Sequence, residues 1–158
     1  MTALSGPAPD RPRRIEGLIP HRRPMLAVGE LIGLSADQAT SRTVIQADSF
    51  FLDAQGRVEE ALWFEMTAQT FAALAAGRAK PGAAGTEPGF LAAVKKMKFF
   101  GRPEVGMAVE VTVRVLSRVD DFAVIEGRAV QAGRLLAEGQ VTIFVPGSGS
   151  AGDGAEEP

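Results

Sequence analysis

The feature that most constrains this sequence is a long apolar segment with strong helix propensity, Glu59 to Gly77. Alanine, leucine and methionine are frequent in it, glutamates stand at its start, and Gly77 followed by Pro81 is typical of a helix end. Its apolar side chains point to every side of the predicted helix, so no face is reserved for solvent. We therefore expect a central helix that other structure encloses.

Two polar residues interrupt this apolar helix. Glu65 and Gln69 are four positions apart, so they share one face, and their neighbours on it are small alanines. Burying a carboxylate is unfavourable unless the group is paired or protonated. We therefore expect Glu65 to be buried and to have a chemical function.

Strand patterns flank the predicted helix on both sides. The predicted strands are 25–34 and 39–47 before the helix, and 90–100, 109–115, 122–130 and 135–145 after it. Valines alternate with polar residues from Val109 to Val115, which is typical of a half-buried strand. Gly127 and Gly139 lie inside predicted strands, where they indicate bends or bulges.

One apolar helix and one antiparallel sheet can bury each other if the sheet curls around the helix. The expected fold class is therefore α+β, a hotdog fold, in a single domain over residues 15–146. Residues 1–14 are rich in proline and arginine and 147–158 are of low complexity, so both are predicted to be disordered. A mobile loop is expected at 78–88. A single sheet leaves an open edge, which favours a dimer.

Composition excludes several classes of function. The chain of 158 residues has no cysteine and one histidine, which argues against disulfides and against a Cys/His metal site. The formal charge is −2, and without Asp153, Glu156 and Glu157 of the C-terminal tail it is about +1, which is too weak for nucleic-acid binding by charge alone. No apolar run has the length of a membrane span or the pattern of a signal peptide. We expect a cytoplasmic protein without a metal, nucleic-acid or membrane partner.

Three segments carry a family resemblance: LIPHRRPML at 18–26, FEMTAQ at 64–69 and GFLAAVKKMKF at 89–99. In the same order, they resemble the signature regions of the bacterial 3-hydroxyacyl-acyl-carrier-protein dehydratases. Within this group the chain looks most like the dehydratase-like hotdog proteins of aryl polyene pathways. The resemblance covers about residues 15–145. It implies that His21 and Glu65 are catalytic, that they meet across a dimer interface, and that no cofactor is needed.

The chemistry of dehydration agrees with this pair. A base must remove the proton beside the thioester carbonyl, and an acid must protonate the departing hydroxide. His21 suits the base and Glu65 suits the acid. Backbone N–H groups at the helix start, around Ala61, are expected to bind the thioester oxygen. Gln69 is predicted to orient Glu65 or the substrate hydroxyl, and Ala72 to leave room for an acyl chain.

Two departures from the family pattern keep other interpretations open. Glu60 and Ala61 stand where the family has Pro-Gly, and residues 50–60 replace a glycine-rich loop. One alternative is a hotdog acyl thioesterase, in which Glu65 activates water. Another is a catalytically weak subunit that binds acyl cargo or pairs with an active homologue. The simpler interpretation of His21, without the resemblance, is an exposed residue in a turn. The simpler interpretation of Gln69 is a residue with a structural function.

The interpretation as a dehydratase also predicts the partners. The substrate is expected to be a thioester of acyl carrier protein or of coenzyme A. The second subunit is expected to be an identical or homologous hotdog chain, in a dimer or a higher oligomer.

Overall fold

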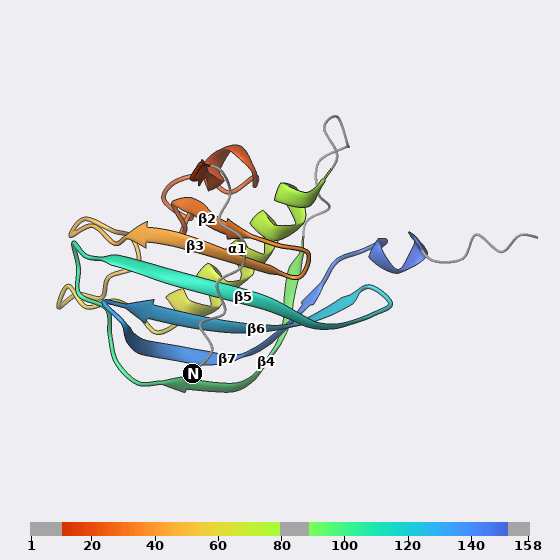
Figure 1. Cartoon of the computed structure of the whole chain (residues 1–158). Helices are drawn as coiled ribbons and strands as arrows, with labels where there is room; N and C mark the ends of the chain where they lie inside the picture. Colours follow the sequence, from red (N-terminus) through yellow and green to blue (C-terminus); the bar gives the residue numbers. More distant parts are fainter. Residues whose placement is uncertain (1–10, 80–88, 152–158) are drawn as a thin grey trace, which may run out of the picture.

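The computed structural model describes residues 11–79 and 89–151 of the chain. In this part, seven strands form one antiparallel sheet that curves around one long helix, α1 (Leu62–Arg78) (Figure 1). The hotdog fold expected from the sequence is thus confirmed. No helix of the described residues is long and apolar enough to cross a membrane.

The sheet places the strands in the order β1-β2-β3-β5-β6-β7-β4, and each is antiparallel to its neighbours. The strands are β1 (Arg13–Arg14), β2 (Glu30–Leu34), β3 (Gln38–Val44), β4 (Phe90–Phe99), β5 (Ala108–Val119), β6 (Phe122–Gln131) and β7 (Arg134–Phe144). Two 3₁₀ turns, η1 (Ile15–Gly17) and η2 (Ser148–Ala151), complete the described structure. After α1 the chain reaches the far edge of the sheet, where β4 pairs with β7.

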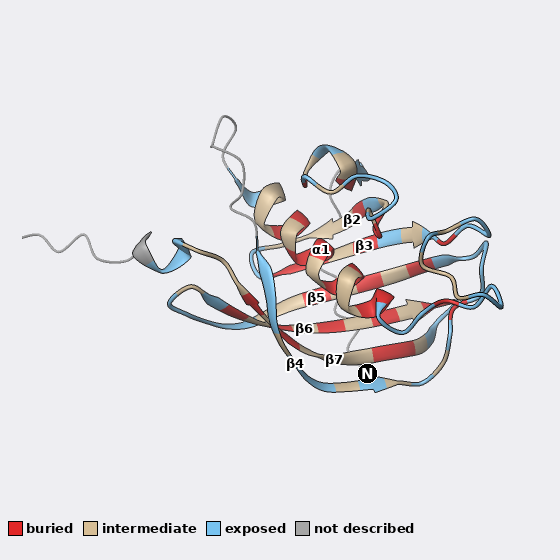
Figure 2. Cartoon of the chain, turned by 180° about the vertical axis from the view of Figure 1, so that it is seen from behind, coloured by how far each residue is buried: buried red, intermediate tan, exposed pale blue. Residues whose placement is uncertain are grey.

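The core lies between α1 and the concave face of the sheet. The helix packs mainly against β2, β3, β5, β6 and β7. Met66 and Leu74 are at most 1% exposed, and burying a side chain of this size contributes roughly 1.5–3 kcal/mol. Figure 2 shows buried residues along α1 and the strands that face it, whereas β4 is largely exposed. Within this one chain, one face of α1 is only half-buried; Ala68, Ala72 and Ala75 lie on it.

Two glycines mark close contacts. Gly127 and Gly139 are direct partners in the β6–β7 register, and the register shift between these strands lies elsewhere, at Ala129. Gly139 lies opposite the register shift between Lys95 and Lys98 of β4, so the predicted bulge is confirmed beside this glycine. A Cβ atom added at Gly127 would lie 2.8 Å from two side-chain atoms of Thr67 on α1. At Gly139 it would overlap Met97 of β4. Glycine is needed at both positions because neighbouring side chains occupy the space of a Cβ.

Several element boundaries differ from the sequence predictions. The helix begins at Leu62 rather than Glu59, because residues 59–61 form a tight turn in which Leu62 N–H donates to the carbonyl of Glu59 at 3.1 Å. The strand predicted from Met25 begins at Glu30. Met25 and Ala27 lie outside the sheet because their backbone groups form hydrogen bonds with the side chain of Gln69 on α1.

The predicted disordered ends are described only in part. Arg13 and Arg14 pair with β2 as β1, and residues 148–151 form η2. The rest of both ends, residues 1–10 and 152–158, lies outside the described residues, as does most of the predicted loop, residues 80–88.

Candidate active site

The two predicted catalytic residues meet in one chain. His21 lies in the loop between η1 and β2, and Glu65 lies in the first turn of α1. The Nε2 atom of His21 is 3.7 Å from the Oε1 atom of Glu65. In this structure of a single chain both groups come from the same chain, and the implied arrangement across a dimer interface stays a prediction. Glu65 is also not buried as predicted, since 35% of its side chain is exposed.

The loop that carries His21 is held by local contacts. The guanidinium of Arg22 donates to the carbonyls of Ile19 and His21, both at 2.8 Å. The N–H of Leu26 donates to the carbonyl of Arg22 at 3.0 Å, and the Arg23-Pro24 bond is cis. These hydrogen bonds constrain the turn around the histidine.

Gln69 joins this loop to the helix. Its Nε2 group donates to the carbonyl of Met25 at 2.9 Å, and its Oε1 atom accepts from the N–H of Ala27 at 2.8 Å. The same Nε2 group donates to Oε1 of Glu65 at 2.6 Å. Gln69 is only 1% exposed and both ends of its amide are engaged, so it connects Glu65 to the loop.

A cleft of about 830 Å³ opens beside the His21–Glu65 pair. On the helix side its lining includes Glu65, Ala68, Phe71, Ala72 and Ala75, and opposite them stand Phe90, Leu91, Arg118 and Ile143 from the ends of β4, β5 and β7. We call this space the helix cleft. Ala75 is ten positions after Glu65, which corresponds to a helical rise of about 15 Å. The helix cleft is therefore long enough for an extended apolar chain.

Ala72 and Ala61 differ in their relation to the helix cleft. Ala72 lines it, as expected of a residue that leaves room for an acyl chain. Ala61 is the N-cap residue of α1, is exposed, and is not among the residues that line the helix cleft. Glu59 and Glu60 are also exposed. The three residues before α1 are thus exposed, whereas Leu62 and Trp63 at its start are buried.

Only three charged or titratable side chains line the described part of the helix cleft: His21, Glu65 and Arg118. The Nδ1 atom of His21 is buried and has no hydrogen-bond partner among the described residues. The other ring nitrogen, Nε2, faces the carboxylate of Glu65. This geometry combines a base, an acid and an apolar channel, which is what elimination or hydrolysis of an acyl thioester requires.

Arg118 is not among the site residues predicted from the sequence. The valine alternation from Val109 to Val115 suggests no reason for a later arginine of this strand to face the helix. The guanidinium carbon of Arg118 nevertheless lies 5.6 Å from the ring centre of Phe71 on α1. Arg118 faces the helix because of a register shift between Val115 and Ser117. No simple sequence pattern predicts this shift.

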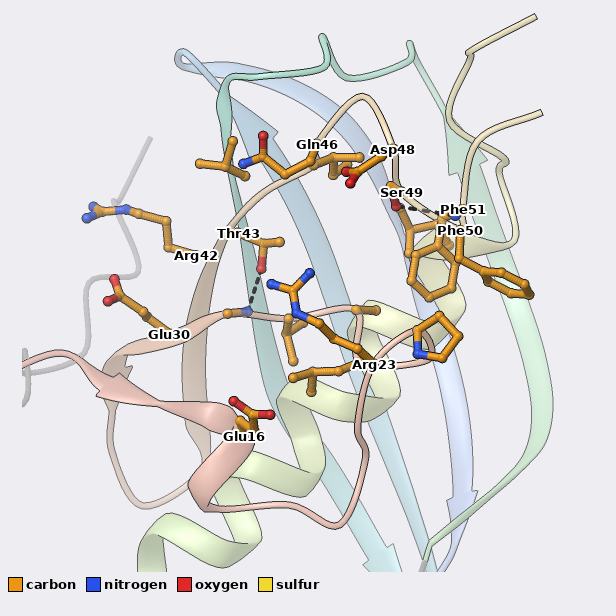
Figure 3. A pocket seen from close by; sticks show the side chains of 18 of the residues that line it. Glu16, Arg23, Glu30, Arg42, Thr43, Gln46, Asp48, Ser49, Phe50 and Phe51 are labelled. Atoms are coloured by element: carbon orange, nitrogen blue, oxygen red, sulfur yellow. Dashed lines mark hydrogen bonds between the residues drawn. The ribbon is translucent and has the colours of Figure 1, made fainter. Parts of the chain in front are cut away.

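A second cavity of about 450 Å³ lies between the loop before β2, the end of β3 and residues 46–51 (Figure 3). Arg23 extends into it, and Phe50 and Phe51 stand at one side. Its lining also mixes arginines with the carboxylates of Glu16, Glu30 and Asp48. None of the five residues predicted from the sequence lines this cavity, so the helix cleft is the candidate active site.

Comparisons with known proteins agree with the fold. The structure resembles the dehydratase heterocomplex ApeI:P from Xenorhabdus doucetiae, with a TM-score of 0.78, 20% identity, and coverage of 87% of this chain and 94% of that chain. It also resembles the E. coli PaaI protein from the phenylacetic acid degradation operon, with a TM-score of 0.58, 15% identity, and coverage of 72% and 80%. At these identities, the similarities establish the hotdog fold.

A third similar structure is a hypothetical thioesterase from Streptococcus pneumoniae with coenzyme A. Its TM-score is 0.58, its identity is 11%, and the match covers 73% of this chain and 84% of that chain. A search of curated proteins gave no match. The family model of the ApeP-like proteins, described as ApeP dehydratase, matches residues 13–152. The chain therefore belongs to the ApeP-like dehydratase family.

Proposed function

We propose that this chain dehydrates (3R)-3-hydroxyacyl thioesters of acyl carrier protein or coenzyme A to trans-2-enoyl thioesters. The observation that carries the proposal is the 3.7 Å approach of His21 to Glu65 at one end of the mainly apolar helix cleft. Membership of the ApeP-like dehydratase family supports the same reaction class.

The proposed reaction uses His21 as the base. Its Nε2 atom takes the proton from C2 of the substrate, and the electron pair of that C–H bond forms the C2=C3 double bond. The C3–O bond breaks, and the departing hydroxide takes a proton from Glu65 to leave as water. The proton then returns from the imidazolium of His21 to the carboxylate of Glu65, which restores both groups.

In this proposal the two oxygens of Glu65 have different tasks. Oε1 accepts the hydrogen bond from Gln69 and faces His21. Oε2 is therefore the oxygen that holds and delivers the proton. Ala72 and its alanine neighbours on α1 would lie along the acyl chain, which the apolar surface of the helix cleft would hold.

Product analysis tests this proposal against the thioesterase alternative. The purified chain is incubated with a 3-hydroxyacyl-CoA, and enoyl thioester and free thiol are measured separately. We expect enoyl thioester without thiol release. Thiol release without enoyl product would favour a thioesterase, in which Glu65 activates water, and would contradict the dehydratase proposal.

A specific observation also favours pairing with a second hotdog subunit. The edge strand β4 exposes Phe90 by 56%, Leu91 by 46% and Val94 by 39%. An open apolar edge of this kind readily accepts another strand. We propose that the chain forms a dimer or higher oligomer with itself or with a homologous hotdog chain, and that this pairing covers β4.

The molar mass of the purified chain, alone and after co-expression with a homologous hotdog dehydratase, tests this assembly. We expect a dimer or larger species in at least one of the two samples. A monomer in both would contradict the pairing. Turnover only in the mixed sample would show that the chain functions as a subunit that needs an active homologue.

A further inference from the structure

Arg118 faces α1 because of a β-bulge. Val115 is paired with the buried Ile125, so both point toward the helix. Regular alternation would next direct Ser117 inward. Instead, the register shift pairs Arg118 with Ala123, which is 1% exposed and faces the core. A bulge that redirects a side chain is common beside functional sites, and here it moves a cation to the inner face of the sheet.

Among the described residues, no carboxylate forms an ion pair with Arg118. It lies at the end of the sheet where β5 turns into β6, close to the start of β4 and the end of β7 (Figure 1). The aromatic ring of Phe71 lies beneath its guanidinium. No described residue forms an ion pair or hydrogen bond with its guanidinium, and the only carboxylate in the described lining of the helix cleft is Glu65.

Arg118 of β5 lies beside α1 at the level of Phe71. Phe71 is six positions after Glu65, a helical rise of about 9 Å. The guanidinium therefore stands further along the helix cleft than the His21–Glu65 pair. If the thioester of a ligand lies at the His21–Glu65 pair, another group of the same ligand can extend along the helix cleft to Arg118.

We propose that Arg118 is the anion-binding group of the helix cleft, and that the preferred ligands are acyl thioesters with a negative charge more than one helical turn away from the reacting carbons. The inference rests on the proposed function, since it takes the helix cleft as the thioester site. Two sources supply this charge: the phosphate of a phosphopantetheine arm, or a carboxylate on the acyl chain. Guanidinium groups bind both oxyanions in a bidentate manner.

Binding measurements separate these sources. The probes are three trans-2-enoyl thioesters: octenoyl-phosphopantetheine with a phosphate, octenedioyl-pantetheine with a carboxylate, and octenoyl-pantetheine with neither. Their dissociation constants are measured by calorimetry with the full chain in its native assembly. At least one anionic probe should bind about tenfold tighter than the neutral probe, as one charge-assisted contact allows.

Variants then test the role of Arg118 itself. In Arg118→Gln the preference for the anionic probe should fall to about twofold or less, and Arg118→Lys should retain part of it. Arg128→Gln is the matched control, because this arginine lies beside Glu138 on the outer face of the sheet. It should keep the full preference. The preference should also weaken as salt is raised.

Three results would overturn the inference: equal affinity for all three probes, an unchanged preference in Arg118→Gln, or no binding of any probe. Dehydration is measured separately and distinguishes the two proposals. Turnover without a preference for anions would leave the dehydratase proposal intact and remove the role of Arg118. If the preference for anions depends on Arg118 but no dehydration is observed, the role of Arg118 is supported and the dehydratase proposal is contradicted.

Discussion

Gln69 donates a 2.6 Å hydrogen bond to Glu65, and it does so through the same carboxylate oxygen that lies 3.7 Å from the imidazole of His21. The other contacts of Gln69 bind the backbone of the loop that carries His21. One buried amide therefore sets both the direction of the proposed acid and the distance of the proposed base. The loop, and not only the helix, depends on this side chain.

Replacing Gln69 with leucine should affect both stability and turnover. The N–H of Ala27 and the carbonyl of Met25 would lose their partner, which should lower the free energy of unfolding by about 1–3 kcal/mol. Displacement of the loop and of Glu65 should reduce kcat on the order of 100-fold. Urea unfolding and steady-state kinetics measure the two effects.

Gln131→Leu is the matched control for this variant. Gln131 is 4% exposed and binds the backbone N–H and carbonyl of Glu104, far along the sheet from the helix cleft. It should lose similar stability and keep its kcat. Equal losses of kcat in the two variants would show that Gln69 acts only through stability.

Gly127 is expected to tolerate no side chain. In Gly127→Ala the new methyl group would press on Thr67 of α1, which should cost about 1–3 kcal/mol of stability. Gly101→Ala is the control, because its Cβ would meet only Leu136 at an ordinary 3.6 Å. Thermal and urea unfolding should show that Gly127→Ala is clearly less stable than Gly101→Ala. A Gly127→Ala protein as stable as the Gly101→Ala protein would contradict the close approach of sheet and helix.

Ala72→Leu should shorten the acyl chain that the helix cleft accepts. The larger side chain would project into the space beside the helix. We expect kcat/KM to fall roughly tenfold for a long-chain 3-hydroxyacyl-CoA, while a four-carbon substrate reacts nearly as in the wild type. The short substrate serves as the internal control for folding. Equal loss for both chain lengths would indicate that the acyl group does not lie along Ala72.

The loop before α1 should respond to acid through Asp53. The backbone N–H of Arg57, together with the Arg57 guanidinium and the N–H of Gln55, holds the pKa of Asp53 below its usual value of 3.8, despite some opposing desolvation. Because the pKa is lowered in the folded state, the ionised group stabilises the fold above pH 3.8. This contribution is lost as the pH falls through the lowered value.

The variant Asp53→Asn tests this pH dependence. At neutral pH it should be less stable than the wild type, and the difference should shrink as the pH falls below the usual pKa of an aspartate. Urea midpoints of both proteins over a pH series provide the measurement. A difference that stays constant down to acidic pH would show that ionisation of Asp53 does not contribute.

The sequence predicted the fold because its periodicities are strong. The apolar stretch from Leu62 onward and the alternating valines of β5 each allow one secondary structure, and their order leaves few ways to bury the helix. The boundaries were less predictable because they depend on tertiary contacts. The backbone at Met25 binds Gln69 instead of a neighbouring strand, and no local pattern around Met25 reveals this.

The candidate site was predictable in residue type but not in arrangement. His21 and Glu65 were identified from their motifs, whereas their approach within one chain and the exposure of Glu65 depend on how the loop folds onto α1. Arg118 was missed because a single extra residue in β5 reverses the faces of the strand. A bulge of this kind is a property of the pairing between strands, not of either sequence alone.

The most direct test is the rate of water elimination from a 3-hydroxyacyl thioester, measured for the wild type, His21→Ala and Glu65→Gln in the assembly that is active. Glu59→Gln, an exposed glutamate outside the helix cleft, is the control. We predict that each of the first two variants loses about 10²–10⁴-fold in kcat while remaining folded, and that the control matches the wild type. Wild-type rates in both His21→Ala and Glu65→Gln would contradict the assignment of this pair.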